Sequence, residues 1–325
     1  MYTLNEIDAV VDKGISSLNW EGDPGELYEP IEYLISIGGK RLRPKMAIIC
    51  FNLFYDKIDN SIVYPALALE IFHGFTLIHD DIMDGASLRR NQPTVHKKWN
   101  NNIAILSGDV MCIKSYKLIA FTPEKHIKDV LTLFSDTAAQ VCEGQQFDMN
   151  YETLPLITTG EYLDMIGLKT AVLMACSAKM GAIIGGAPPE CSEALYNYGY
   201  LLGLAFQIKD DYLDSFGDTN IFGKAIGGDI LSNKKTWLLV ECLKRAQGKD
   251  SDKLNELITS TNCEPKGKIA EVKALYEKLG VKTAAEEEIG EYHKKAQKAL
   301  DCVHFSPDQR ERLLEFANLM LNREK

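Results

Sequence analysis

The chain has 325 residues, of which 46% are hydrophobic and 25% are charged, a composition typical of a globular protein with a sizeable core. Its net charge of -10 argues against general nucleic-acid binding. The eight cysteines are scattered and the N-terminus lacks the features of a signal peptide, which together indicate a cytoplasmic protein with reduced thiols. No uninterrupted apolar run reaches the length of a membrane span, so we expect no integral membrane segment.

Helical periodicity dominates the chain, and strand signals are few. Apolar residues recur at helical spacing over 62–75 and 195–205, and Gly-, Pro- and Asn-rich turns separate such runs. The apolar stretch 170–184 predicts a central helix, whereas the Lys- and Glu-rich stretch 244–300 predicts outer amphipathic helices. We therefore predict a single all-α domain over residues 1–325, built from roughly ten or more helices.

Two motifs of the form Asp-Asp-x-x-Asp lie in apolar surroundings and are candidate metal sites. On a helix, the first and last aspartate of such a motif share a face. Carboxylates on a buried face repel one another unless cations hold them, and Mg²⁺ prefers oxygen ligands and completes its shell with water and phosphate. Two such clusters facing one cavity would hold a diphosphate from both sides. The aspartates are Asp80, Asp81, Asp84, Asp210, Asp211 and Asp214.

Basic residues flank the first acidic motif. The stretch 38–44 reads Gly-Gly-Lys-Arg-Leu-Arg-Pro, in which Lys40 and Arg43 offer phosphate a point charge and a planar fork. Alone, such a stretch is more often a structural helix start than a phosphate site. Arg89 and Arg90 follow the motif, either as its salt-bridge partners or as anion ligands once metal ions neutralise the aspartates. Lys40, Arg43 and Arg90 then form a second, metal-free anion site.

Other polar residues give weaker signals one by one. His73 lies seven residues before Asp80, on the same helix face, and is either a core histidine or a substrate ligand. Later in the chain come isolated residues that are individually typical of surface or capping positions: Asp148, Lys169, Thr170, Gln207, Lys224 and Lys234.

Taken in order from Gly38 to Lys234, these motifs resemble the trans-isoprenyl diphosphate synthases, the polyprenyl synthetase family. The resemblance implies the isoprenoid synthase fold, a helical bundle around a central active-site cavity. It also implies Mg²⁺, several ions per site, and a homodimer, for which an apolar helix surface near residues 100–120 is a candidate interface. The family usually has Gly where this chain has Asn91, and Asn tolerates the left-handed backbone that such a turn needs.

The resemblance assigns roles to individual residues. An allylic diphosphate, held through Mg²⁺ by the six aspartates, ionises to a cation that isopentenyl diphosphate attacks. Positive charge around the allylic diphosphate comes from Arg89, Lys169, Lys224 and Lys234. Isopentenyl diphosphate is held by Gly39, Lys40, Arg43, His73 and Arg90. The Lys169 carbonyl, the Thr170 hydroxyl and the Gln207 amide oxygen face the cation.

We expect Asp81→Ala or Asp211→Ala to cut turnover and to leave the fold intact.

Product length is read from the residues before Asp80, because the growing chain extends from the motif towards the start of its helix. Phe75 and Thr76, five and four residues upstream, are therefore candidate floors of the product tunnel. An aromatic residue at the fifth position alone resembles geranylgeranyl diphosphate synthases, and aromatics at both positions resemble farnesyl diphosphate synthases. We predict geranylgeranyl diphosphate, with farnesyl diphosphate as the alternative product.

Two alternative functions belong to other classes of protein. A terpene cyclase of the same fold shares the first acidic motif, but it needs no second diphosphate site and replaces the second Asp-Asp-x-x-Asp. A non-catalytic synthase subunit typically loses acidic motifs. The presence of both motifs here argues against each reading.

Overall fold

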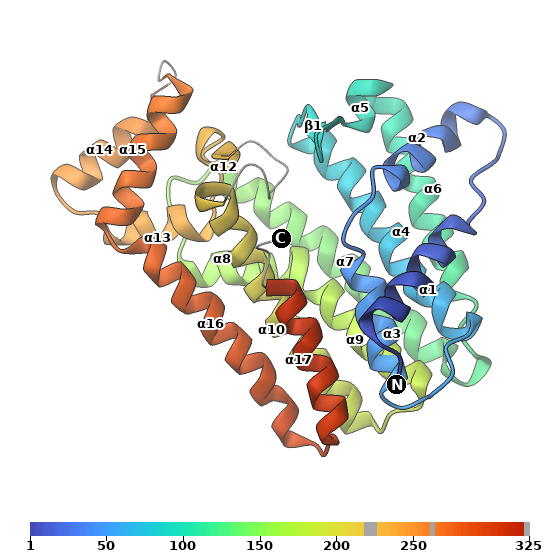
Figure 1. Ribbon diagram of the computed structural model, residues 1–325. Coiled ribbons are helices and arrows are strands. Elements are labelled where there is room, and N and C mark those ends of the chain that lie inside the picture. Colours follow the sequence, from blue (N-terminus) through green and yellow to red (C-terminus); the bar gives the residue numbers. More distant parts are fainter. Residues whose placement is uncertain (218–225, 261–263, 322–325) are drawn as a thin grey trace. The chain divides into compact units, whose positions relative to one another are not determined.

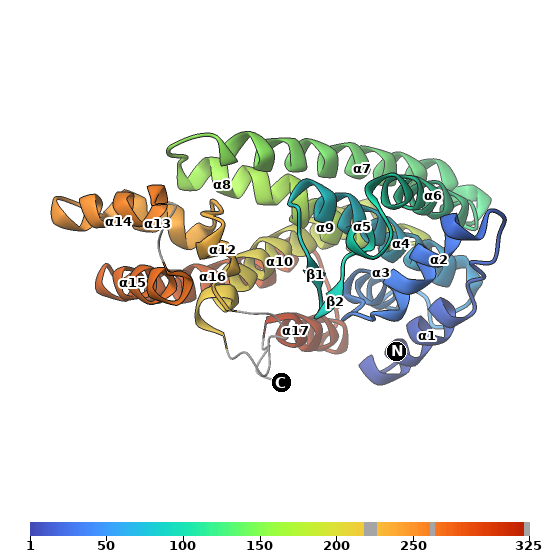
Figure 2. The ribbon, with the colours of Figure 1, turned by 90° about the horizontal axis from the view of Figure 1, so that it is seen from above.

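The computed structural model describes residues 1–217, 226–260 and 264–321, and these residues are 78% helical, which confirms the predicted all-α fold. Figures 1 and 2 show the helices from two directions. The helices are α1 (Leu4–Ser16), α2 (Gly25–Ser36), α3 (Leu42–Asn52), α4 (Asn60–Met83), α5 (Val95–Lys98), α6 (Asn101–Ile119), α7 (Glu124–Glu152), α8 (Thr159–Ile166), α9 (Val172–Gly185), α10 (Pro189–Phe216), α12 (Gly228–Leu231), α13 (Trp237–Arg245), α14 (Lys249–Thr259), α15 (Pro265–Lys278), α16 (Val281–Ala299) and α17 (Pro307–Leu321).

Three short elements complete the fold. A π-helical turn, Gly167–Ala171, joins α8 to α9, and a 3₁₀ turn, Leu300–Cys302, follows α16. The strands β1 (Leu88–Arg89) and β2 (Gln92–Pro93) pair antiparallel, with Leu88 opposite Pro93.

The chain forms two compact units. The first comprises residues 1–137, 173–199 and 300–316, and the second comprises 138–172, 200–299 and 317–325. The single domain over residues 1–325 therefore stays a prediction.

Helix α4 is the central element of the first unit. Most of its residues from Ile62 to Gly74 are buried, because the helix is apolar on nearly every face and packs along α3 and α6 (Figure 1). The predicted central helix over 170–184 is confirmed as well, since residues 171–178 of this stretch are all buried. In the second unit, the more polar helices α14 to α16 bury only a stripe each, as expected of amphipathic helices. Helix α13 differs, because its residues 237–242 are all buried.

Two helical stretches, Asn60–Met83 and Thr159–Gly185, are long and apolar enough to cross a membrane by length and composition. Within their most apolar windows, 61% and 72% of the residues are buried inside the protein, as in the core helices of proteins that do not enter a membrane. Both stretches are therefore weak evidence of a membrane span, and the expected lack of an integral membrane segment stays a prediction.

Glycines allow α9 to pack backbone-to-backbone on α3 in the first unit. A Cβ atom added at Gly181 would lie 1.9 Å from the carbonyl oxygen of Ala47, and one at Gly185 would lie 2.8 Å from that of Phe51. Contacts this close leave no room for a side chain, so the packing of these two helices depends on both glycines.

We expect Gly181→Ala to lower the free energy of unfolding by about 1–3 kcal/mol or more, because α9 has to move away from α3. The matched control is Gly290→Ala in α16, where an added Cβ meets nothing within 4 Å. That change should stabilise the protein by about 0.5–1 kcal/mol through helix propensity. Urea unfolding of both variants measures the difference, and equal midpoints would contradict the close approach of α9 and α3.

Candidate active site

The first acidic motif lies where α4 ends. The helix closes with Gly85 in the left-handed region and with backbone hydrogen bonds from Gly85 to Ile82 (3.2 Å) and from Ala86 to Asp81 (3.0 Å). This is a Schellman motif, which uses a glycine just past the helix to satisfy its last carbonyls. Asp80 and Asp84 are one turn apart, as the Asp84 N–H to Asp80 carbonyl bond of 2.8 Å requires, so their predicted helical spacing is confirmed.

Arg89 holds the buried carboxylate of this motif. Its Nη2 and Nε donate to Asp81 Oδ1 at 2.6 and 3.0 Å, and its Nη2 lies 3.6 Å from Asp80 Oδ2. Asp81 is only 2% exposed, and its burial raises the pKa of its carboxyl group even though Arg89 opposes that rise. Of the two roles open to Arg89, the structure therefore displays the salt bridge.

The β1–β2 hairpin aims the two adjacent arginines in different directions. Its two-residue turn consists of Arg90 and Asn91, with φ of 51° and 59°. Two consecutive left-handed residues define a type I′ turn, which matches the twist of paired strands. The expectation that Asn91 tolerates a left-handed backbone is confirmed. Arg89 points to Asp81, whereas the Arg90 guanidinium lies against Gly39, where an added Cβ would be 2.6 Å from Nη1.

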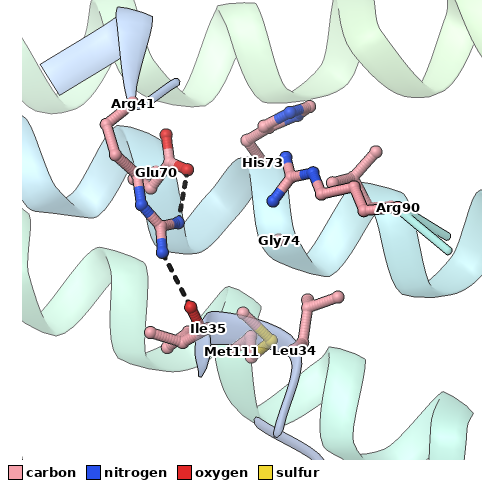
Figure 3. A pocket seen from close by; sticks show the side chains of 9 residues that line it. Leu34, Ile35, Arg41, Glu70, His73, Gly74, Arg90 and Met111 are labelled. Carbon is pink, nitrogen blue, oxygen red and sulfur yellow. Dashed lines mark hydrogen bonds and ion pairs between the residues drawn. The ribbon is translucent and has the colours of Figure 1, made fainter. Parts of the chain in front are cut away.

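A basic pocket surrounds His73 in the middle of α4 (Figure 3). Arg41 and Arg90 line it from opposite sides, and the buried carboxylate of Glu70 on α4 pairs with Arg41. Apart from His73, the rest of the lining is apolar, as at Leu34 and Met111. Lys40 is exposed next to this pocket. Sequence reasoning missed Glu70, although a lone glutamate in an apolar helical run was a usable signal.

Burial and mutual repulsion control the charges of the basic pocket. Burial lowers the pKa of Arg43 to about 10, with Arg90 adding to the effect and Glu70 opposing it. Within the described chain, the buried Nε of Arg43 has no hydrogen-bond partner. Burial and four nearby arginines hold the pKa of His73 well below its ordinary value, so its imidazole is neutral at neutral pH. This group of cations around a neutral histidine suits an anion.

In the second unit, Asp211 of α10 is the centre of a hydrogen-bond network. Its Oδ2 accepts from the Tyr162 hydroxyl at 2.6 Å and from the Trp237 N–H at 2.9 Å. Its Oδ1 accepts from the Gln207 amide at 3.1 Å. Burial, assisted by the charge of Asp229, raises the pKa of Asp211 to about 7 despite these donors. Tyr162 was not singled out from the sequence, because nothing local marks it.

Lys169 and Thr170 lie in the π-helical turn, inside a continuous helix from Thr159 to Gly185 rather than at a helix start as their sequence context indicated. Such turns are frequent at functional sites. Gly144 of α7 packs so closely here that an added Cβ would lie 2.2 Å from the Lys169 backbone nitrogen. Lys169 Nζ pairs with Asp148 at 2.6 Å, and the Thr170 hydroxyl donates to Gln207 Oε1 at 3.1 Å.

The remaining predicted residues of the second unit lie near the end of α10. The carboxylate of Asp214 is 8% exposed and accepts the Asp229 N–H at 3.0 Å, at the start of the one-turn helix α12. Asp210 is half-buried on α10, and Lys234 follows α12 with its N–H bonded to the Asp229 carbonyl. Lys224 lies outside the described residues.

The two candidate chain-length residues lie on different sides of α4. The Phe75 ring contacts Phe72 and His79, with centroids 5.4 and 4.8 Å away. Phe72 in turn packs on Phe134 of α7, at 5.3 Å. The Thr76 hydroxyl donates to the His73 carbonyl at 2.8 Å, so this small side chain lies back against its own helix.

Comparison with known proteins places the chain in a family. It matches the polyprenyl synthetase family over residues 24–279. A short chain isoprenyl diphosphate synthase from Methanothermobacter thermautotrophicus is 36% identical over 326 residues, which cover 100% of this chain and 98% of that protein. A crystal structure of a geranylgeranyl pyrophosphate synthase matches with a TM-score of 0.93 and 39% identity over 100% of both chains. A Caulobacter crescentus polyprenyl synthase, complexed with calcium and isoprenyl diphosphate, matches with a TM-score of 0.89 and 29% identity over 99% of this chain and 97% of that one.

These similarities define an isoprenyl diphosphate synthase, a prenyltransferase of isoprenoid biosynthesis. The chain belongs to the polyprenyl synthetase family, and within it to the short-chain synthases. Members of this family use a divalent metal and isoprenyl diphosphate substrates. The predicted family, fold class and enzyme class are thereby confirmed, whereas the product, the individual site residues and the dimer stay predictions.

The acidic motifs fit a hard divalent cation. Their side chains are all carboxylates, and burial raises the pKa of both Asp81 and Asp211, so a nearby cation would stabilise their charged forms. Among the residues described, no three His, Cys, Asp or Glu side chains form a metal-binding group by themselves.

The network around Asp211 changes the expectation for its variants. Asp211→Ala leaves the Tyr162 hydroxyl and the Trp237 N–H without an acceptor, and we expect a loss of about 2–4 kcal/mol in unfolding free energy rather than an intact fold. Asp211→Asn keeps one oxygen for these donors and should cost about 1 kcal/mol or less. Chemical denaturation of both variants measures this, and equal stabilities would show that the network contributes little.

Proposed function

We propose that this chain condenses isopentenyl diphosphate with an allylic diphosphate in the trans, head-to-tail sense, with geranylgeranyl diphosphate as the main product. One observation carries the proposal: α4 bears two different features that suit a diphosphate, one that needs a metal ion and one that does not. The carboxylates of Asp80 and Asp81 lie at its C-terminal end, and the basic pocket around His73 lies about two turns earlier. A metal-dependent diphosphate site beside a second site that binds an anion through basic side chains without metal is what a prenyltransferase with two diphosphate substrates needs.

In the proposed reaction, the six aspartates of the two motifs would hold several Mg²⁺ ions, which would supply positive charge to the allylic diphosphate. The allylic C–O bond breaks, and its electron pair leaves with the diphosphate. The double bond of isopentenyl diphosphate forms the new C–C bond, and the proton lost from the adjacent carbon goes to the released diphosphate. When bound, Mg²⁺ stabilises the negative charge of the leaving group.

In the structure, two of the cationic side chains are paired with aspartates, and they can bind a diphosphate only after those pairs separate. Arg89 is paired with Asp81 and Lys169 with Asp148. We propose that Arg89, Lys169, Lys224 and Lys234 supply positive charge to the allylic diphosphate. Mg²⁺ held by Asp81 would neutralise that carboxylate in place of Arg89.

Fixed dipoles face the developing allylic cation in this proposal. The Thr170 hydroxyl donates to the Gln207 amide oxygen, and the Gln207 amide group donates to Asp211, so both side chains have a defined orientation. Together with the Lys169 carbonyl, they would stabilise positive charge in a place where water would quench the cation.

We propose that the basic pocket binds isopentenyl diphosphate. Arg90 supplies charge from the pocket wall, Arg43 and Lys40 would add charge from beside the pocket, and the neutral His73 supplies a hydrogen bond. Gly39 has no side chain, so its backbone can approach the anion. A side chain at this position would also collide with the Arg90 guanidinium.

The geranylgeranyl product rests on Phe75. Its ring is supported by Phe72 and, through it, by Phe134, which gives a tunnel floor that does not yield easily. The similar geranylgeranyl pyrophosphate synthase structure supports the same chain length.

A product assay tests the class and the chain length together. We expect purified protein with Mg²⁺, radiolabelled isopentenyl diphosphate and an allylic starter to form C20 product without a partner protein. Phe75→Ala should lengthen the product because it removes the floor, and Thr76→Phe should shorten it to C15. Unchanged products in both variants would place the floor elsewhere. No incorporation with any starter would favour a non-catalytic subunit.

The acidic motifs are tested by turnover. Asp81→Ala should lower kcat by about 100-fold or more, because a metal ligand is lost. The control is Asp12→Ala, which changes an exposed aspartate of α1 in the same unit. Circular dichroism establishes that both variants are folded. Near-normal turnover of folded Asp81→Ala would rule out the metal-binding role of this motif.

We further propose that the enzyme is a cytoplasmic homodimer. Leu106 and Ile113 of α6 are 56% and 67% exposed, which makes this helix a suitable interface.

A further inference from the structure

One guanidinium group, that of Arg41, ties together three helices of the first unit. Its Nη1 donates to Glu70 Oε1 of α4 at 2.7 Å, and its Nη2 donates to the Ile35 carbonyl in the last turn of α2 at 2.8 Å (Figure 3). Arg41 itself is the residue before α3. Both charged side chains are nearly buried, at 11% and 7% exposure, so neither is a solvated surface charge.

The backbone of Arg41 is held in a conformation that it would not adopt by preference. Its φ and ψ are 50° and 39°, in the left-handed region, which is unfavourable for a residue with a side chain. Gly38 and Gly39 precede it with φ of 81° and 151°. Tertiary contacts of the Arg41 side chain therefore help to hold the turn over residues 38–41, and the Arg41–Glu70 ion pair is one of them.

This turn sets the geometry of the basic pocket. Gly39 lies against the Arg90 guanidinium, and α3 begins directly after Arg41, so the position of Arg43 follows from that of the turn. Arg43 keeps a buried Nε without a partner in the described part of the chain, whereas the guanidinium of Arg41 is engaged on two sides.

We propose that Arg41 and Glu70 are positioning residues of the isopentenyl diphosphate site. Their ion pair holds the turn over residues 38–41 in place, and through it Gly39 and Arg43. Arg41 itself does not bind the anion. This inference rests on the proposed function of the basic pocket.

The competing roles predict opposite changes in anion affinity when Glu70 is replaced. If Glu70 were only a negative charge beside an anion site, its removal would tighten anion binding. If Arg41 were an anion ligand restrained by Glu70, its release would tighten binding as well. If the pair positions the turn, removal of Glu70 weakens binding, because the buried Arg41 loses its partner and the turn moves.

The experiment measures isopentenyl diphosphate binding by calorimetry in EDTA, so that the metal-dependent site does not contribute. We expect wild-type protein to bind, and Glu70→Gln and Arg41→Lys to bind about tenfold more weakly. In steady-state assays with Mg²⁺, the KM for isopentenyl diphosphate should rise by a similar factor, while the KM for the allylic substrate stays unchanged.

Asp8→Asn is the matched control. It removes the partner of Lys45, which lies on α3 and is paired with Asp8 at 2.8 Å, and it should leave isopentenyl diphosphate binding unchanged. The double variant Arg41→Met/Glu70→Met replaces the buried pair by apolar side chains of similar length, which usually preserves stability. It should fold and should bind isopentenyl diphosphate more weakly than the wild-type protein. It therefore replaces a single variant that does not fold.

Equal or tighter binding by folded Glu70→Gln would overturn the positioning role and leave the basic pocket as the isopentenyl diphosphate site. A wild-type protein that does not bind isopentenyl diphosphate in EDTA would instead overturn the assignment of the basic pocket, and this inference with it. The two failures are thus distinguishable.

Discussion

Burial of carboxylates inside apolar helices is the constraint on which the rest of the candidate site depends. Asp81 and Asp211 are 2% and 5% exposed, and an isolated charge at such a place is costly. In the first unit, the hairpin after α4 supplies Arg89 to Asp81. In the second unit, Tyr162 and Trp237 donate to Asp211. These donors reduce the cost only in part, because the pKa of both carboxyls remains raised, and a divalent cation is the natural complement.

At the basic pocket, the buried charges are positive instead of negative. Burial and repulsion lower the pKa of Arg43 and of His73, and Glu70 opposes this effect at Arg43. Arg41 and Arg90, which have left-handed backbones although they carry side chains, both line this pocket. Unfavourable backbone conformations often gather at functional sites, where surrounding contacts maintain them. The pocket is therefore organised before an anion arrives, and binding an anion would relieve the repulsion among its cations.

Much of the fold was predictable from the sequence, because the signals concerned are local. Apolar periodicity indicated an all-α chain and a buried helix over 170–184, and the spacing of Asp80 and Asp84 indicated one helical turn. The left-handed turn at Asn91 followed from the chemistry of the asparagine side chain. The π-helical turn at Lys169 was missed, because no local pattern marks it; its backbone packs against Gly144 of α7, which is distant in the sequence.

The sequence by itself determined the helical class, the two acidic motifs and the set of basic residues that accompany them, since neighbouring residues suffice to specify these features. Only the tertiary structure decided which charge meets which. Arg41 rather than Arg43 pairs with Glu70, 29 residues away. Lys169 pairs with Asp148, and Tyr162 donates to Asp211 across 49 residues. Pairing at such separations depends on how the helices pack, because the same side chains in another packing would find other partners.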